Sequence, residues 1–305
     1  MRSVLFVIGY PDRLVADHDV LLESARAADF DVELISPSTL SIVIDEDTTR
    51  VLVHGKQLVP DVVLPRGVNR PWPFVSQVLQ IWESQGVRVV PSQRAADICA
   101  DKLTTTRVLA EARVPVLPTI GLAPGPDNVL DDGIDGFDAT LVAKPARASK
   151  GRGVEKFGSS AAAESSLRAS RPLQAGMVDH HVVQPIASGA GIDYRVVVSS
   201  HEDVSVIVAV TRRIAPTGEF VTNRPGSIVE DVHEPESVVP AVCRVARDAV
   251  RALGLSFGGV DVIEHEGRPV VLEVNAWPGL AAEKRGRQIA DALVEVARSS
   301  ISTRP

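Results

Sequence analysis

The chain has little cysteine, with Cys99 and Cys243 as the only two among 305 residues. They lie far apart, and neither belongs to a group of residues with the spacing of a metal site. We therefore expect two buried, reduced thiols and no disulfide, which indicates a cytoplasmic protein. Neither cysteine, nor any serine–histidine pair, stands in a context that suggests covalent catalysis.

Long apolar runs are also missing, since none approaches the roughly 20 residues of a membrane-spanning helix. The apolar stretch within Met1–Tyr10 is shorter than the core of a secretory signal, and Pro11 and Asp12 follow it directly. We expect no membrane partner.

Positive charge is not in excess, because the formal net charge is −7. A surface that follows nucleic-acid phosphates usually appears as a basic excess, so we expect no nucleic-acid partner. Two nucleotide-binding patterns are absent as well. No GxGxxG motif opens the first helix, and the glycine loop near residue 150 lacks the Lys-Ser/Thr pair of a Walker A motif.

The apolar content that is present suffices for two or three lobes in a chain of this length. Over the first ninety residues, apolar runs alternate with amphipathic segments, which predicts a parallel sheet with covering helices. The predicted strands are Val4–Ile8, Val32–Ile35 and Val62–Leu64, the helices are Asp17–Asp29 and Pro73–Gln85, and an inserted hairpin joins Ile42–Ile44 to Val51–Val53.

A turn-rich loop containing Arg66 and Arg70 follows the strand at Val62–Leu64. Ligands favour the carboxyl ends of strands in α/β sheets, and a guanidinium can hold a carboxylate with two hydrogen bonds. We therefore predict Arg66, with Arg70, as the residues that recognise a substrate carboxylate. A solvated loop without function is the alternative.

The middle of the chain reads as a connection between lobes followed by a second lobe. Pro91 ends a short strand, and the polar segment Gly125–Asp138 predicts a mobile surface loop. The remaining elements are helices at Gln93–Cys99, Lys102–Ala112 and about 236–253 and 282–299, and strands at Val182–Gln184, Tyr194–Val198 and Val204–Val210.

Residues 141–154, LVAKPARASKGRGV, form a strand that delivers Lys144, then a loop of small and basic residues. Glycines let backbone N–H groups approach a phosphate closely, and Lys144 can supply the compensating charge. A plain turn is the alternative for this loop.

Residues 258–279 predict a hairpin in which His265, Glu266 and Gly267 form a three-residue loop and Glu264 pairs with Arg268. Strand alternation then places three oxygen-bearing side chains on one face, which are Asp261, Glu273 and Asn275. Such a hard, all-oxygen set is suited to Mg²⁺. The alternative is a solvated strand face.

Taken in order, these segments resemble the ATP-grasp enzymes, and among them the RimK-like carboxylate–amine ligases, which are related to lysine-biosynthesis ligases and glutathione synthetase. The resemblance covers nearly the whole chain and is stronger after residue 89. It is carried by Asp101-Lys102, Lys144-Pro145, Ser149-x-Gly151-x-Gly153-Val154, Gln184, Asp193-x-Arg195, Thr222-Asn223, Gly259-Val260-Asp261, Glu273-Val274-Asn275 and Pro278-Gly279.

The resemblance implies an α/β protein with α+β lobes in the ATP-grasp fold, with the nucleotide between the central and C-terminal lobes. The implied divisions are an N-terminal α/β domain at 1–92, interlobe helices at 93–120, a central lobe at 121–187 and a C-terminal lobe at 188–305.

The resemblance also implies roles for individual residues. Arg195 and Arg213 would lie at the acyl group and phosphates, and Asp261, Glu273 and Asn275 would bind two Mg²⁺ ions, with Mn²⁺ able to substitute. The implied ATP-binding residues are Lys102, Lys144, Ser149, Gly151, Gly153, Gln184, Pro185, Ile186 and Asn223. The chain departs from the family pattern at Pro185, where an acidic residue is usual, and at Val221, where RimK enzymes carry arginine.

The expected activity is ADP-forming ligation, in which ATP phosphorylates a carboxylate and an amine attacks the acyl phosphate. The expected partners are small carboxylates and amines, with a peptide, an acidic carrier protein that contacts Arg66, Arg70 and Arg88, and a homo-oligomer left open. A non-catalytic ATP-binding regulatory or scaffold protein is the alternative function, and the presence of all three metal ligands counts against it.

Overall fold

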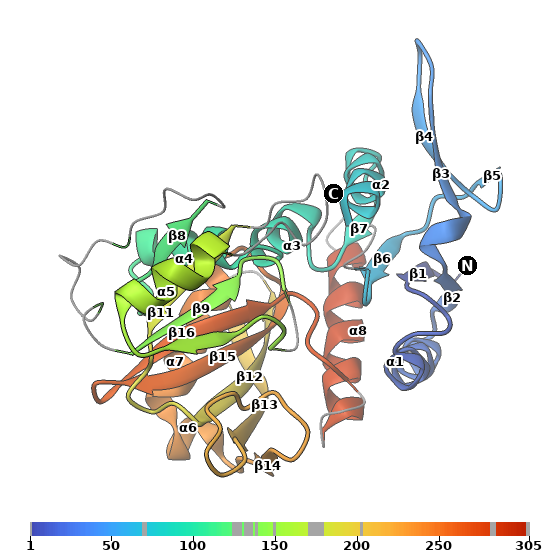
Figure 1. Cartoon of the computed structure of the whole chain (residues 1–305). Helices are drawn as coiled ribbons and strands as arrows, with labels where there is room; N and C mark the ends of the chain where they lie inside the picture. Colours follow the sequence, from blue (N-terminus) through green and yellow to red (C-terminus); the bar gives the residue numbers. More distant parts are fainter. Residues whose placement is uncertain are drawn as a thin grey trace.

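The structure is a computed structural model of the chain. It describes residues 2–68, 72–123, 130, 137, 140–148, 151–169, 180–201, 204–280 and 285–302. Three sheet-containing bodies follow one another along the chain, and helix α8 (Gly286–Ser302) stands between the first and the last of them (Figure 1).

The N-terminal lobe is a parallel sheet with the strand order β2-β1-β6-β7. Its strands are buried on both faces, since Phe6 and Ile8 pack with helix α2 while Leu5 and Val7 pack with helices α1 and α8. Near-continuous apolar runs are what such strands require. The elements are β1 (Val4–Ile8), α1 (Val15–Ala27), β2 (Asp31–Ile35), β6 (Val62–Pro65), α2 (Trp72–Ser84) and β7 (Arg88–Val89).

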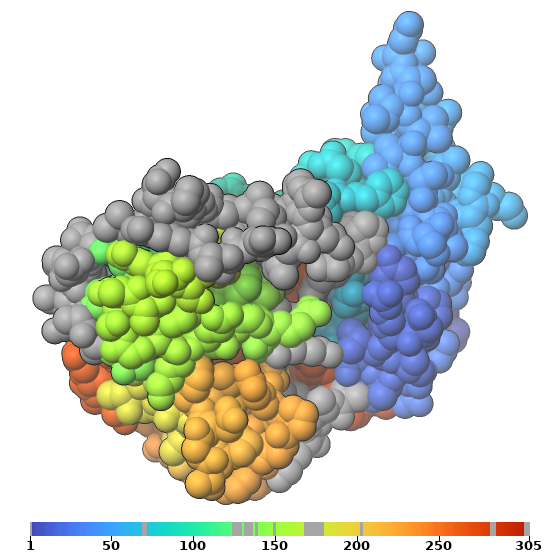
Figure 2. Space-filling view, in the orientation of Figure 1, coloured from blue at the N-terminus to red at the C-terminus, as the bar shows by residue number. Residues whose placement is uncertain are grey.

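A small antiparallel sheet is inserted into this lobe after the short 3-10 helix Pro37–Thr39. It consists of β3 (Leu40–Ile44), β4 (Thr49–Val53) and β5 (Lys56–Gln57), and so confirms the inserted hairpin with one extra short strand. Figure 2 shows this arm, in light blue, standing clear of the rest of the surface.

Two capped helices, α3 (Gln93–Cys99) and α4 (Lys102–Glu111), lead to the central lobe. Asp101 ends the link between them and accepts a hydrogen bond from the backbone N–H of Thr104 at 3.0 Å, which caps α4. The central sheet is antiparallel in the order β10-β9-β11-β8 and carries helix α5 (Ser160–Ala169). Its strands are β8 (Ile120–Leu122), β9 (Leu141–Pro145), β10 (Glu155–Phe157) and β11 (His181–Pro185).

The C-terminal lobe is a five-stranded antiparallel sheet in the order β14-β13-β12-β15-β16. One face, including Val196 and Val260, packs against helix α7. The other face packs against α8 through Val197 at one end of β12 and carries Asp193 and Arg195 at the other. The elements are β12 (Ile192–His201), β13 (Val204–Ile214), β14 (Ile228–Asp231), α6 (Pro235–Val238), α7 (Pro240–Ala252), β15 (Phe257–His265) and β16 (Arg268–Asn275).

The turn of the β15–β16 hairpin differs from the predicted one. Glu266 and Gly267 both have positive φ, at 52° and 74°, so the turn has two residues and His265, not Glu264, pairs with Arg268. That shift alone would turn Glu273 away from Asp261. A β-bulge between Asp261 and Val262 returns the two side chains to one face and brings Asp261 opposite Glu273.

The helix predicted over about 236–253 is broken into α6 and α7. Pro240 has no backbone N–H, and its ring disfavours helical geometry at the residue before it. Val239 accordingly has φ −133° and ψ 55°. The domain boundaries at 92, 120 and 187 stay a prediction, although β8 and β11 belong to one sheet.

The prediction that Arg66 recognises a substrate carboxylate needs correction. Its side chain is only 2% exposed, and Nη2 donates to Asp17 Oδ2 at 2.6 Å while Nη1 donates to the Pro278 carbonyl at 2.8 Å. The backbone N–H of Leu280 donates to the same Asp17 oxygen at 3.1 Å. Arg66 therefore joins the N-terminal lobe to the segment after β16, and Arg70 lies outside the described residues.

Replacing Arg66 with alanine should lower the free energy of unfolding by about 3–5 kcal/mol, because it breaks the buried ion pair between Arg66 and Asp17. Chemical denaturation measures this, with Arg2→Ala as control. Arg2 pairs with Asp29 at the surface, where both side chains are more than 60% exposed, so its loss should cost no more than about 1 kcal/mol. Equal losses in the two variants would contradict the structural role of Arg66.

Candidate active site between the central and C-terminal lobes

A pocket lies between the sheets of the central and C-terminal lobes, with a volume of about 920 Å³ including its open mouth. It brings together most of the predicted site residues, from elements far apart in the sequence. Those that line it are Lys102, Lys144, Gly151, Gln184, Pro185, Ile186, Arg213, Asn223, Asp261 and Glu273.

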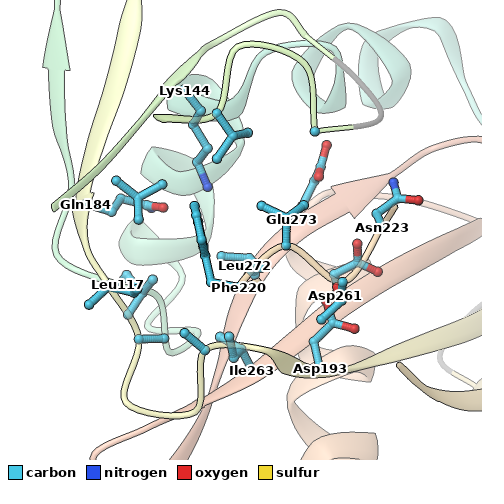
Figure 3. A pocket seen from close by; sticks show the side chains of 18 of the residues that line it. Leu117, Lys144, Gln184, Asp193, Phe220, Asn223, Asp261, Ile263, Leu272 and Glu273 are labelled. Atoms are coloured by element: carbon cyan, nitrogen blue, oxygen red, sulfur yellow. Dashed lines mark hydrogen bonds between the residues drawn. The ribbon is translucent and has the colours of Figure 1, made fainter. Parts of the chain in front are cut away.

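One end of the pocket is apolar, with Leu117, Ile263 and Leu272 close to the buried side chain of Gln184 (Figure 3). Such a surface suits a flat nucleobase, whose edges need a few polar partners. Gln184 is already engaged, because its amide donates to Thr119 Oγ1 at 2.8 Å. Sequence reasoning missed Leu117 and Leu272, and the latter reaches the pocket because it is the extra residue of the bulge.

The backbone after Gln184 offers a specific donor. Pro185 has no N–H, and the N–H of Ile186 donates to the carbonyl of Thr140 at 2.9 Å. The N–H of Ala187 has no acceptor among the residues the structure describes, and Ala187 lines the pocket. The N–H of Ala187 is thus a backbone donor at the pocket without an acceptor in the described part of the chain.

The opposite end of the pocket carries charged side chains in a row across neighbouring strands. Arg195 on β12 lies opposite Asp261 on β15, which lies opposite Glu273 on β16. Arg195 donates to Asp261 from Nε at 2.5 Å and from Nη2 at 2.9 Å. Nη2 of Arg213, from β13, lies 3.0 Å from Asp261 Oδ2.

Asp261 is therefore ionised although it is only 4% exposed. Burial alone would raise the pKa of Asp261, but Arg195 and Arg213 outweigh it and lower that pKa to about 2. An ionised carboxylate can bind a cation, provided that the guanidinium groups of Arg195 and Arg213 move away from it.

Two lysines complete the charged end from the side of the central lobe. Lys102 Nζ lies 3.5 Å from Glu273 Oε1 and also contacts the carbonyl of Ala148. Lys144 is buried, and burial lowers its pKa to about 8, with Lys102 adding to that effect and Glu273 opposing it. Both ammonium groups thus lie near Glu273 at the charged end of the pocket.

The residues fit Mg²⁺ by the chemistry of their donors, since Asp261 and Glu273 oppose each other and Asn275 lies two positions further along β16. Among the described residues, the amide nitrogen of Asn275 has no hydrogen-bond partner, and no group of three or more His, Cys, Asp and Glu side chains is arranged to hold a metal ion. The set is therefore two carboxylates and an amide. Gly259 on β15 pairs with Asn275 on β16. A Cβ atom at position 259 would approach the side chain of Pro278 to 2.8 Å.

The glycine loop is described only in part, because Ser149 lies outside the described residues. Gly151 and Gly153 have φ of 65° and 69°, a region that other residues adopt with strain. A Cβ on Gly153 would also approach Pro145 to 2.9 Å. The backbone therefore favours glycine at both positions, and most strongly at Gly153.

The two cysteines take no part in this chemistry and are not bonded to each other. Cys243 is buried, whereas Cys99 is half-buried and not fully buried as expected. Burial raises the pKa of the Cys99 thiol to about 12, and nearby Glu273 adds to the effect. This thiol is consequently a poor nucleophile near neutral pH.

Comparison with known proteins agrees with the fold and the pocket. A family model described as a RimK-like ATP-grasp domain matches residues 99–297. The chain is 32% identical over 264 residues to a probable alpha-L-glutamate ligase of Thioalkalivibrio sulfidiphilus, covering 85% of this chain and 83% of that protein. It is 30% identical over 262 residues to the ribosomal protein bS6–L-glutamate ligase of Salmonella paratyphi B, with the same coverage of 85% and 83%.

Solved structures show the same fold. The ATP-grasp ligase PsnB, complexed with a phosphomimetic variant of its minimal precursor, Mg and ADP, has a TM-score of 0.66 and 20% identity over 98% of this chain and 99% of that one. D-alanine–D-alanine ligase from Bacillus anthracis, complexed with ATP, has a TM-score of 0.69 and 16% identity over 98% of this chain and 97% of that one.

Fold and pocket together define an ATP-dependent, ADP-forming ligase of the ATP-grasp class. The chain belongs to the RimK-like ATP-grasp family, and the predicted family and fold are confirmed. Such ligases use ATP and Mg²⁺. No described helix has the length and the apolar character that crossing a bilayer needs.

The affinity for Mg-ATP should fall as the pH rises from 7 to 9. The free protein loses the positive charge of Lys144 as the pH passes about 8, so Lys144 must then regain a proton when a phosphate binds, at a cost approaching tenfold in Kd per pH unit. Isothermal titration calorimetry measures Kd at each pH. Lys144→Arg keeps its charge and should flatten the profile, so an unchanged slope in that variant would exclude Lys144 as the titrating group.

Proposed function

We propose that this ligase joins the amino group of L-glutamate to a carboxylate, including one on a peptide or protein, through an acyl phosphate. The printed names of the relatives support this substrate class, since one is a probable alpha-L-glutamate ligase and another acts on ribosomal protein bS6. The single observation that carries the chemistry is the pocket, whose apolar end suits a base and whose charged end suits phosphates.

The charged end answers the main difficulty of the reaction, which is that a carboxylate must attack an already anionic phosphate. Lys102 and Lys144 offset the charge of the nucleotide from one side, and Arg195 and Arg213 offset it from the other. Asp261, Glu273 and Asn275 would hold two Mg²⁺ ions, with Mn²⁺ able to substitute, and the metal would supply further charge neutralisation at the transferring phosphate.

The arginines would have to change partners for this to occur, because both pair with Asp261. Asp261 would hold the cation, whose charge would replace that of the two arginines and leave the guanidinium donors of Arg195 and Arg213 for the reacting oxygens. The amine then displaces phosphate from the acyl carbon, so that the overall reaction consumes ATP, acid and amine and gives amide, ADP and phosphate. No side-chain nucleophile is required.

In the presence of L-glutamate and a pool of peptides, the protein should release ADP and form a peptide that has gained one glutamyl residue. Mass spectrometry would detect this product.

Glu273→Gln should reduce turnover by roughly two orders of magnitude or more, because charge neutralisation at phosphate is lost. Glu264→Gln is the matched control, since Glu264 is exposed on the same hairpin. ATP binding without any amide product, across pools of other amines and acids, would favour a regulatory protein. Normal turnover by Glu273→Gln would contradict the metal site.

A further inference from the structure

Asp193 is a buried carboxylate at the charged end of the pocket, and the reaction as described gives it no role. It lies on β12 with only 2% of its surface exposed, and its side chain lies beside Asp261 (Figure 3). The register places Asp193 directly opposite Arg213 on β13. Two positions further along β12, Arg195 lies opposite Asp261 on the other side. The four side chains alternate in charge across three strands.

Three donors engage the Asp193 carboxylate. Arg213 donates from Nε to Oδ1 at 2.6 Å and from Nη2 to Oδ2 at 2.7 Å, and Thr222 Oγ1 donates to Oδ2 at 2.5 Å. A two-point bond to a carboxylate fixes both the plane and the direction of a guanidinium. The Thr222 bond in turn fixes the carboxylate.

These bonds hold one edge of the Arg213 guanidinium group and set the direction in which the group points. Its Nη2 reaches Asp261 as well, whereas Nη1 has no hydrogen-bond partner among the residues that the structure describes. Without Asp193, Asp261 would be the one remaining carboxylate paired with Arg213 in the described part of the chain. Arg213 would then compete with a cation for the residue that the metal needs.

We propose that Asp193 is a positioning residue that holds Arg213 toward the terminal phosphate of the bound nucleotide and away from full pairing with Asp261. Thr222 orients Asp193 and belongs to the same unit. The inference rests on the proposed function for the nature of the ligand. Asp193 itself lines the pocket, and its proposed role is to determine where Arg213 can act.

The deciding experiment compares the affinities for Mg-ADP and Mg-AMPPNP by isothermal titration calorimetry. Asp193→Asn removes the charge and one acceptor oxygen, so the affinity for Mg-AMPPNP should fall about 10–100-fold, the usual effect of losing a supporting residue. The affinity for Mg-ADP, which lacks the γ-phosphate that Arg213 would meet, should change less than about threefold on the same reasoning.

Thr222 gives an independent variant pair in case Asp193→Asn fails to fold. Thr222→Val removes the hydroxyl and should weaken Mg-AMPPNP binding by about fivefold, the effect of about one hydrogen bond, while Thr222→Ser should recover most of it. Asp248→Asn, an exposed carboxylate on α7, is the control and should bind both nucleotides as the wild type does.

If Asp193 has only a structural role, Asp193→Asn should weaken the binding of both nucleotides equally or of neither. Either result overturns the proposal. The same holds if Thr222→Val and Thr222→Ser behave identically. Nucleotide binding requires no second substrate. A wild-type protein that binds nucleotide but forms no amide would therefore refute the proposed function. The ratio of the affinities for Mg-ADP and Mg-AMPPNP would still decide the role of Asp193.

Discussion

The active site depends on one constraint, which is that charges buried on a sheet must be neutralised by their neighbours. Asp193, Arg195, Arg213 and Asp261 satisfy it by alternating in sign across β13, β12 and β15. Removing one member would leave another as an uncompensated charge in a poorly solvated place, which is far costlier than losing a surface pair. The same network keeps Asp261 ionised and ready for a cation. Binding chemistry and structural stability therefore use the same residues.

The lobes are joined so that the N-terminal sheet is fixed relative to the strand that carries Glu273. Arg66 and Asp17 hold the backbone at Pro278 and Leu280, a few residues beyond that strand. Close by, the rings of Trp72 and Trp277 meet edge to face with centroids 5.0 Å apart. A substrate held by the N-terminal lobe would thus keep a defined distance from the charged end of the pocket.

Much of this arrangement could be predicted from the sequence, because apolar periodicity and breaking residues mark most elements. The helix at Gln93–Cys99 has the predicted bounds, and the strand at Val4–Ile8 does too. The hairpin register could not be predicted, since a two-residue turn and a bulge each shift pairing by one residue and their effects on the face cancel. Arg66 was assigned to substrate because its partner Asp17 is distant in sequence and the pairing is visible only in three dimensions. Asp193 was part of a motif, but its bond to Arg213 follows from strand pairing between β12 and β13.

The central claim is that the pocket activates a carboxylate with the terminal phosphate of ATP. Oxygen tracing tests this most directly, with the acid substrate labelled with ¹⁸O in its carboxylate and the released phosphate analysed by mass spectrometry. Attack by the carboxylate on phosphorus transfers one labelled oxygen to each phosphate formed, so the account predicts phosphate that carries the label in step with amide formation. Unlabelled phosphate, formed at the same rate as the amide, would contradict an acyl phosphate and with it this reading of the site.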